Sequence, residues 1–191
     1  MHQQGRPLGS LKLNTSVSEA VVKNYHGRSN KLNLNLCQKK HSHKKPMEDL
    51  QIIPIIGKEF ADKIIPLIEH SKKSIDIIVY DWKWYPDQIG STIQKFNNSL
   101  IDAVRKNKKI RIITNSYQIL KLLEGIKIKT KNLQSKRLLH TKLMIIDNKI
   151  AILGSHNYTM NAFNINHEVS VIIQEEQVVK RLKTYFENLW W

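Results

Sequence analysis

Residues 140–159 (HTKLMIIDNKIAILGSHNYT) carry side chains that suit phosphoryl chemistry. His140 and Lys142 lie two residues apart, and Ser155 and Asn157 repeat that spacing further along the chain. A histidine can act as a base or a nucleophile, a lysine supplies fixed positive charge, and hydroxyl and amide groups form hydrogen bonds. We therefore expect this stretch to bind and attack a phosphate diester.

The residues between these anchors predict two short strands. Residues 143–146 and 150–153 are apolar and rich in isoleucine, with Asp147-Asn148 between them. Short apolar runs bounded by turn residues are typical of buried strands. Because strand side chains alternate between faces, the residues of each polar pair should share a face, the second pair only if the chain stays extended past Gly154. A hairpin then brings both pairs to one end of a sheet.

This spacing closely resembles the HKD motif of the phospholipase D superfamily, H-x-K-x4-D-x6-G-S-x-N, and every specified position from His140 to Asn157 is occupied. The resemblance covers about residues 48–191. It implies an α/β fold of one domain, in which helices flank a mixed β-sheet. It also implies a phosphodiesterase that forms a phosphohistidine intermediate and needs no metal or other cofactor. The alternative is a hairpin that carries these residues without function.

The resemblance also implies roles for the site residues. His140 would attack phosphorus in one subunit and act as general acid and base in the other. Lys142 and Asn157 would bind the phosphoryl oxygens, and Ser155 would add a hydrogen bond. Glu168 would orient the catalytic imidazole.

Asp147, the acid of the motif, is expected to serve the fold. It lies at the far end of the predicted strand from His140, about 20 Å away if that segment is extended. A turn or a structural ion pair therefore explains Asp147 better than direct catalysis does.

The chain contains one H-x-K-x4-D motif, whereas HKD enzymes use two. None of the other seven histidines begins such a motif. We therefore expect a homodimer with one composite active site across its two-fold axis. The small single-motif members of the superfamily, Nuc-type bacterial endonucleases and mitochondrial phospholipase D-like proteins, have that arrangement.

The composition favours a polyanionic partner. The formal net charge is +15, which points to nucleic acid or an anionic membrane surface. No apolar run is long enough for a transmembrane helix, so we expect no transmembrane segment. An endonuclease that cleaves DNA or RNA is favoured. The alternatives are a phospholipase D-type hydrolase of phospholipids such as cardiolipin, and a nucleic-acid-binding protein without activity.

Residues 1–46 differ in composition from residues 47–191. They hold nine Lys or Arg and one acid, and they lack periodic apolar residues. We expect a disordered basic tail or a presequence, followed by the catalytic domain at 47–191. Cys37, His41 and His43 raise the possibility of zinc, but three candidate ligands in a polar tail favour no metal site. A bacterial cytoplasm is the expected location, or an organelle if the tail is a presequence.

Apolar periodicity predicts alternating strands and helices around the motif. His156 is interpreted as a packing or a surface residue. The aromatic residues Trp82, Trp84 and Tyr85 are interpreted as packing residues, although such aromatics could also stack on bases or insert into lipid. Strands are expected at residues 51–56, 74–80, 109–114, 126–130 and 167–173, and helices at 58–70, 89–106, 117–123 and 175–191.

Overall fold

A computed structural model describes residues 52–126 and 128–191. The predictions for the N-terminal segment, including its zinc ligands and the domain boundary at residue 47, lie outside these residues. The strands are β1 (Ile52–Ile56), β2 (Ser74–Ile78), β3 (Lys109–Ile113), β4 (Ile128–Lys131), β5 (Leu143–Ile146), β6 (Ile150–Gly154) and β7 (Val169–Ile173). The helices are α2 (Glu59–Glu69), α3 (Thr92–Arg105), α4 (Tyr117–Leu123), α5 (Met160–Asn164) and α6 (Glu176–Trp190).

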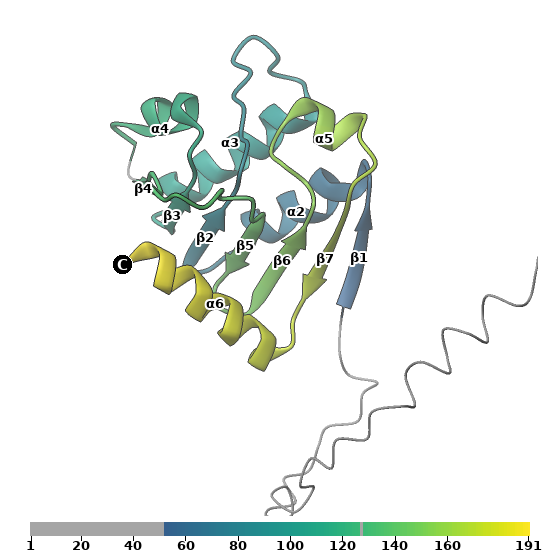
Figure 1. The fold of residues 1–191 in the computed structure, drawn as a ribbon. Coiled ribbons are helices and arrows are strands. Elements are labelled where there is room, and N and C mark those ends of the chain that lie inside the picture. Colours follow the sequence, from purple (N-terminus) through teal and green to yellow (C-terminus); the bar gives the residue numbers. More distant parts are fainter. Residues whose placement is uncertain (1–51, 127) are drawn as a thin grey trace, which may run out of the picture. The chain divides into compact units, whose positions relative to one another are not determined.

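All seven strands form one sheet in the order β1-β7-β6-β5-β2-β3-β4 (Figure 1). β2, β3 and β4 run parallel to one another, and every other neighbouring pair is antiparallel. The two strands predicted within the motif are β5 and β6, joined as a hairpin. The expected α/β fold with a mixed sheet flanked by helices is confirmed.

Both faces of the sheet are covered, which explains why its central strands are almost continuously apolar. On β5, Met144 and Ile146 pack toward α2, α3 and α5, whereas Leu143 and Ile145 pack toward α6. Figure 1 shows α6 crossing one face of the sheet while α2 and α3 lie on the other.

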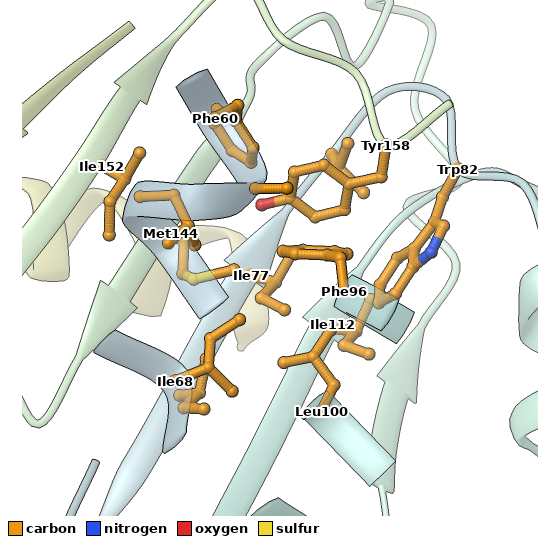
Figure 2. Packing of buried hydrophobic residues seen from close by; sticks show 14 of the residues in the cluster. Phe60, Ile68, Ile77, Trp82, Phe96, Leu100, Ile112, Met144, Ile152 and Tyr158 are labelled. Carbon is orange, nitrogen blue, oxygen red and sulfur yellow. The ribbon is translucent and has the colours of Figure 1, made fainter. Parts of the chain in front are cut away.

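An aromatic cluster joins the loop after β2 to the segment after β6. The Tyr158 ring centroid lies 4.8 Å from that of Phe96 and 5.2 Å from that of Trp82 (Figure 2). Trp82 is 1% exposed, and its Nε1 donates a hydrogen bond to Asn97 Oδ1 at 2.8 Å. Packing is therefore the observed role of Trp82, and stacking on a base is excluded for this buried ring.

The helices differ from the sequence predictions at two places. The helix predicted from Ile89 begins at Thr92, because the Ser91 hydroxyl accepts a hydrogen bond from Gln94 N and caps it. Helix α5 was not predicted, and the Thr159 hydroxyl caps its short turn in the same way. The remaining predicted bounds differ from the observed ones by no more than two residues.

A buried ionic network holds α6 against the sheet. The Asp76 carboxylate on β2 is 1% exposed and accepts hydrogen bonds from Arg111 Nε on β3, at 2.7 Å, and from Lys183 Nζ on α6. Arg111 also forms two hydrogen bonds to Glu187 on α6, which lower the pKa of Glu187 to about 2. Burial of a carboxylate is unfavourable unless the carboxylate is paired. The packing of α6 against the sheet therefore depends on these ion pairs.

This network predicts unequal effects of two Asp→Asn changes. Asp76→Asn should lower the free energy of unfolding by about 2–4 kcal/mol, because it leaves Arg111 and Lys183 with an incomplete set of partners. Asp102→Asn is the matched control, since its exposed pair with Arg105 contributes less than about 0.5 kcal/mol. Urea unfolding followed by circular dichroism measures both values. Equal losses would contradict a structural role for the buried network.

Candidate active site

His140 lies in the segment that enters β5. Its side chain is exposed, and its ring centroid lies 5.2 Å from that of Tyr80, which follows β2. β5 begins only at Leu143, so the histidine precedes the strand rather than lying within it. An imidazole in this position is accessible to a substrate.

Lys142 is buried beside His140. It is 7% exposed, its Nζ donates a hydrogen bond to the His140 carbonyl oxygen at 2.9 Å, and it lies 5.3 Å from the Tyr80 ring centroid. Burial lowers the pKa of Lys142, and the negative charge of Glu168 partly opposes that effect. His140 and Lys142 both contact Tyr80, consistent with the shared face that strand alternation predicts.

Ser155 and Glu168 form a second part of the site. The backbone bends at Ser155, directly after β6, so the chain does not stay extended past Gly154. Ser155 Oγ donates to the Glu168 carboxylate and accepts a hydrogen bond from Val169 N at 3.0 Å. Within the described residues, no hydrogen bond joins Glu168 to His140. Orientation of that imidazole by Glu168 therefore stays a prediction.

Asn157 is held against the loop that follows β2. The side chain is half-buried, and its Oδ1 accepts a hydrogen bond from Asp81 N at 3.3 Å. Its Nδ2 has no hydrogen-bond partner in the part of the chain that the structure describes. Because Asp81 directly follows Tyr80, Asn157 lies at the same end of the sheet as His140 and Lys142, with one amide donor available for a ligand.

Asp147 lies apart from the other five predicted site residues, at the opposite end of β5. Its carboxylate accepts hydrogen bonds from the backbone N of Lys72, Lys73 and Ser74 at 2.7, 2.6 and 2.9 Å. Burial by itself would raise the pKa of Asp147, but these three hydrogen bonds lower it below its ordinary value. Asp147 and Asn148 both have positive φ, at 55° and 56°, as a type I′ hairpin turn requires.

Gly154 and His156 flank Ser155 in the motif, and both lie against Ser170 on β7. A Cβ on Gly154 would lie 2.2 Å from Ser170 Oγ, its paired residue on the neighbouring strand β7, so only glycine fits here. His156 is 1% exposed, its Nδ1 accepts from Ser170 Oγ at 2.8 Å, and its Nε2 donates to Gly57 O at 2.9 Å. Of the two interpretations of His156, packing is confirmed and a surface position is wrong.

Tyr80 is the site residue that sequence reasoning missed. The antiparallel register pairs Ile78 of β2 with Leu143 of β5, and two residues further this alignment puts Tyr80 opposite Thr141. The missing signal was the pairing of β2 with β5. A sequence alone did not reveal that these two strands are neighbours.

The groups available for chemistry at the site are the side chains of His140, Lys142 and Asn157. Across residues 52–126 and 128–191, no group of three or more His, Cys, Asp or Glu side chains is arranged to hold a metal ion. None of the helices in these same ranges combines the length and the apolar character needed to cross a bilayer. Together, the exposed imidazole, the buried ammonium and the free amide donor can attack and bind an anionic ester.

Comparison with known proteins gives consistent matches. A family model described as "Cardiolipin synthase, PLD-like domain" matches residues 64–190. The mitochondrial cardiolipin hydrolase of Canis lupus familiaris is 24% identical over 140 residues, which are 70% of this chain and 52% of that protein. The chain spans about half or less of the length of the curated relatives that it matches first.

Solved structures share the fold. NucT from Helicobacter pylori aligns with a TM-score of 0.63 and 21% identity, over 74% of this chain and 96% of that one. Nuc from Salmonella typhimurium, described as a phospholipase D family member, aligns with a TM-score of 0.58 and 19% identity, over 73% and 95% of the two chains. At these identities the likeness establishes the fold alone.

The buried His156 predicts a loss of stability in mild acid. Burial holds the pKa of His156 below its ordinary 6.5, so below that pH the unfolded chain binds a proton more readily than the folded one. The free energy of unfolding should fall by up to about 1 kcal/mol between about pH 7.5 and about pH 5.5. His156→Gln, which does not titrate, should flatten this dependence in urea unfolding. An unchanged slope would contradict the assignment to His156.

Proposed function

Because the chain belongs to the phospholipase D-like family, whose members are phosphodiesterases, we propose that it is a metal-independent endonuclease that cleaves DNA or RNA. One observation carries the chemistry: the exposed His140 and the buried Lys142 lie together at the end of the sheet that also holds Ser155, Asn157 and Glu168.

Phosphodiesters resist hydrolysis because their negative charge repels nucleophiles and their alkoxide is a poor leaving group. In this proposal the His140 imidazole attacks phosphorus, so that a P–N bond forms as the P–O bond to the leaving group breaks. Lys142 and the free amide donor of Asn157 neutralise and bind the phosphoryl oxygens. The burial of Lys142 strengthens its attraction for phosphate, because little water screens the charge.

The leaving oxygen requires a proton that the attacking histidine cannot supply. We propose that His140 of the partner subunit donates it, and then removes a proton from the water that breaks the P–N bond. The chain has one H-x-K-x4-D motif, which supports a homodimer with one composite site on the two-fold axis.

Ser155, Glu168 and Asp147 receive supporting roles. The hydrogen bond between Ser155 and Glu168 fixes the chain after β6 beside the strand β7. From there Glu168 attracts Lys142 and is the candidate to orient His140 when substrate binds. Asp147 acts on the fold, since its carboxylate is occupied by three backbone N–H groups.

The basic charge of the chain supports a polyanionic substrate, and nucleic acid is one. The chain has 31 Lys and Arg against 16 acids, and electrostatic attraction to phosphates is the general source of nucleic-acid affinity. The compartment remains a prediction, with a bacterial cytoplasm favoured over an organelle.

Hydrolysis of a phospholipid such as cardiolipin is the second candidate, and one structural observation favours it. Leu138, Ile165 and Val169 are 70%, 71% and 57% exposed, and they lie close in sequence to the site residues His140 and Glu168. Exposed aliphatic side chains beside a phosphodiesterase site could contact acyl chains. The relative from Canis lupus familiaris is also named a cardiolipin hydrolase.

The two candidates are separated by assaying both substrates in EDTA. We expect cleavage of labelled single-stranded or duplex nucleic acid, and no release of product from cardiolipin vesicles. His140→Ala should reduce turnover at least about 10³-fold, because it removes the nucleophile. His70→Ala, another exposed histidine far from the motif in sequence, should keep full activity. Cleavage of vesicles alone would reverse the choice of substrate.

The composite site predicts a non-linear mixing curve. Wild-type and His140→Ala chains are unfolded, mixed at constant total concentration and refolded together. If each site needs His140 from both subunits, activity should follow the square of the wild-type fraction. A linear decline, or light scattering that finds an active monomer, would rule out the shared site.

A further inference from the structure

A cavity of ≈ 490 Å³ opens beside the proposed catalytic residues. It lies between the loop after β2, which supplies Tyr80 and Lys83, and the segment from β3 into α4, which supplies Asn115, Tyr117 and Gln118. Figure 1 shows that this loop and α4 lie at the end of the sheet where the chain enters β5. The volume falls within the range of about 300–1,000 Å³ that is typical of ligand pockets.

Tyr80 belongs to both the cavity and the catalytic centre. Its ring centroid is 5.2 Å from that of His140 and 5.3 Å from Lys142 Nζ, and the same side chain lines the cavity. A phosphate bound by His140 and Lys142 would therefore have its neighbouring group at the cavity entrance.

The lining is aromatic and amide-rich rather than cationic or aliphatic. Tyr80 and Tyr117 expose 39% and 73% of their surface, and Asn115 and Gln118 add amide donors and acceptors. The charge of Lys83 is offset by Asp81, whose Oδ1 lies 3.4 Å from Lys83 Nζ. A second phosphate would require unpaired cations, and an acyl chain would require aliphatic side chains. This lining lacks both.

Hydrogen bonds hold two of the residues that line the cavity, Asn115 and Ser116. Ser116 Oγ donates a hydrogen bond to Trp82 O at 2.8 Å, which ties the start of α4 to the loop after β2. Asn115 Oδ1 accepts a hydrogen bond from Leu133 N at 2.9 Å, which orients the amide. Within the described residues, Asn115 Nδ2 has no hydrogen-bond partner, so a donor remains for a ligand. A wall held in this way loses little conformational entropy on binding.

We propose that this cavity is a nucleobase subsite, in which the base next to the scissile phosphate stacks on Tyr117 and forms hydrogen bonds with Asn115 and Gln118. The proposal rests on the nuclease function above and deepens it. A nucleobase is planar, uncharged and bordered by donors and acceptors, which are the properties that this lining recognises. Tyr80 would then link base binding to placement of the phosphate against His140 and Lys142.

The test compares a short fluorescein-labelled single-stranded DNA with the same strand carrying abasic sites. All proteins carry His140→Ala, so that binding is measured by anisotropy without cleavage. Tyr117→Ala should weaken binding of the base-bearing strand about 5- to 20-fold and leave the abasic strand within about 2-fold. Leu122→Ala is the matched control, because this 37% exposed leucine lies on the same helix and does not line the cavity.

The outcomes separate the subsite from the nuclease function. Equal weakening for both strands, or none for either, overturns the subsite even if the wild-type protein cleaves DNA. Base-dependent binding that Tyr117→Ala abolishes supports the subsite even if the wild-type protein cleaves nothing. Absence of binding to both DNA and RNA, with cleavage of cardiolipin vesicles, overturns both proposals.

Discussion

The register of β5 against β2 is the constraint on which the candidate site depends. Pairing of Ile78 with Leu143 leaves Tyr80 beside His140 and Lys142. Because strand side chains alternate, a slip of one residue would turn every β5 side chain to the other face of the sheet. The Asp147 carboxylate fixes this register, since it binds three successive backbone N–H groups where β2 begins. Asp147, the acid of the motif, thus helps to position His140 and Lys142 although it lies at the opposite end of β5.

The Gly-Ser-x-Asn part of the motif is explained by contacts that lie mostly outside it. Gly154 is required because Ser170 on β7 occupies the space where a side chain would project. The backbone then bends, which directs Ser155 to Glu168 and Asn157 to the loop after β2. These contacts come from two other parts of the chain, residues 168–170 and the loop after β2, so the motif specifies the site only in the context of the complete sheet.

The sequence predicted local features well because they depend on local chemistry. The isoleucine-rich runs of β5 and β6, their turn at Asp147 and the fold-related role of that acid all follow from residue type and spacing. The partners of these elements did not follow, because they lie far away in the chain. Tyr80 beside His140, Ser170 beneath Gly154 and the network around Asp76 each require knowledge of which strands are neighbours. Helix α5 was missed because its cap at Thr159 directly follows the motif and its apolar stretch is short.

The position of β1 in the sheet bears on how the chain folds during synthesis. Within the described residues β1 lies at the edge of the sheet, and its neighbour is β7, the strand of this sheet that comes last along the chain. Until β7 has been synthesised, the apolar segment Ile52–Ile56 therefore lacks the strand to which it is hydrogen-bonded in the folded protein. Pairing between segments so distant in sequence is slow, and unpaired apolar strands are prone to misassociation. Until β7 has left the ribosome, β1 is therefore open to misassociation, and chaperone protection would matter during this interval.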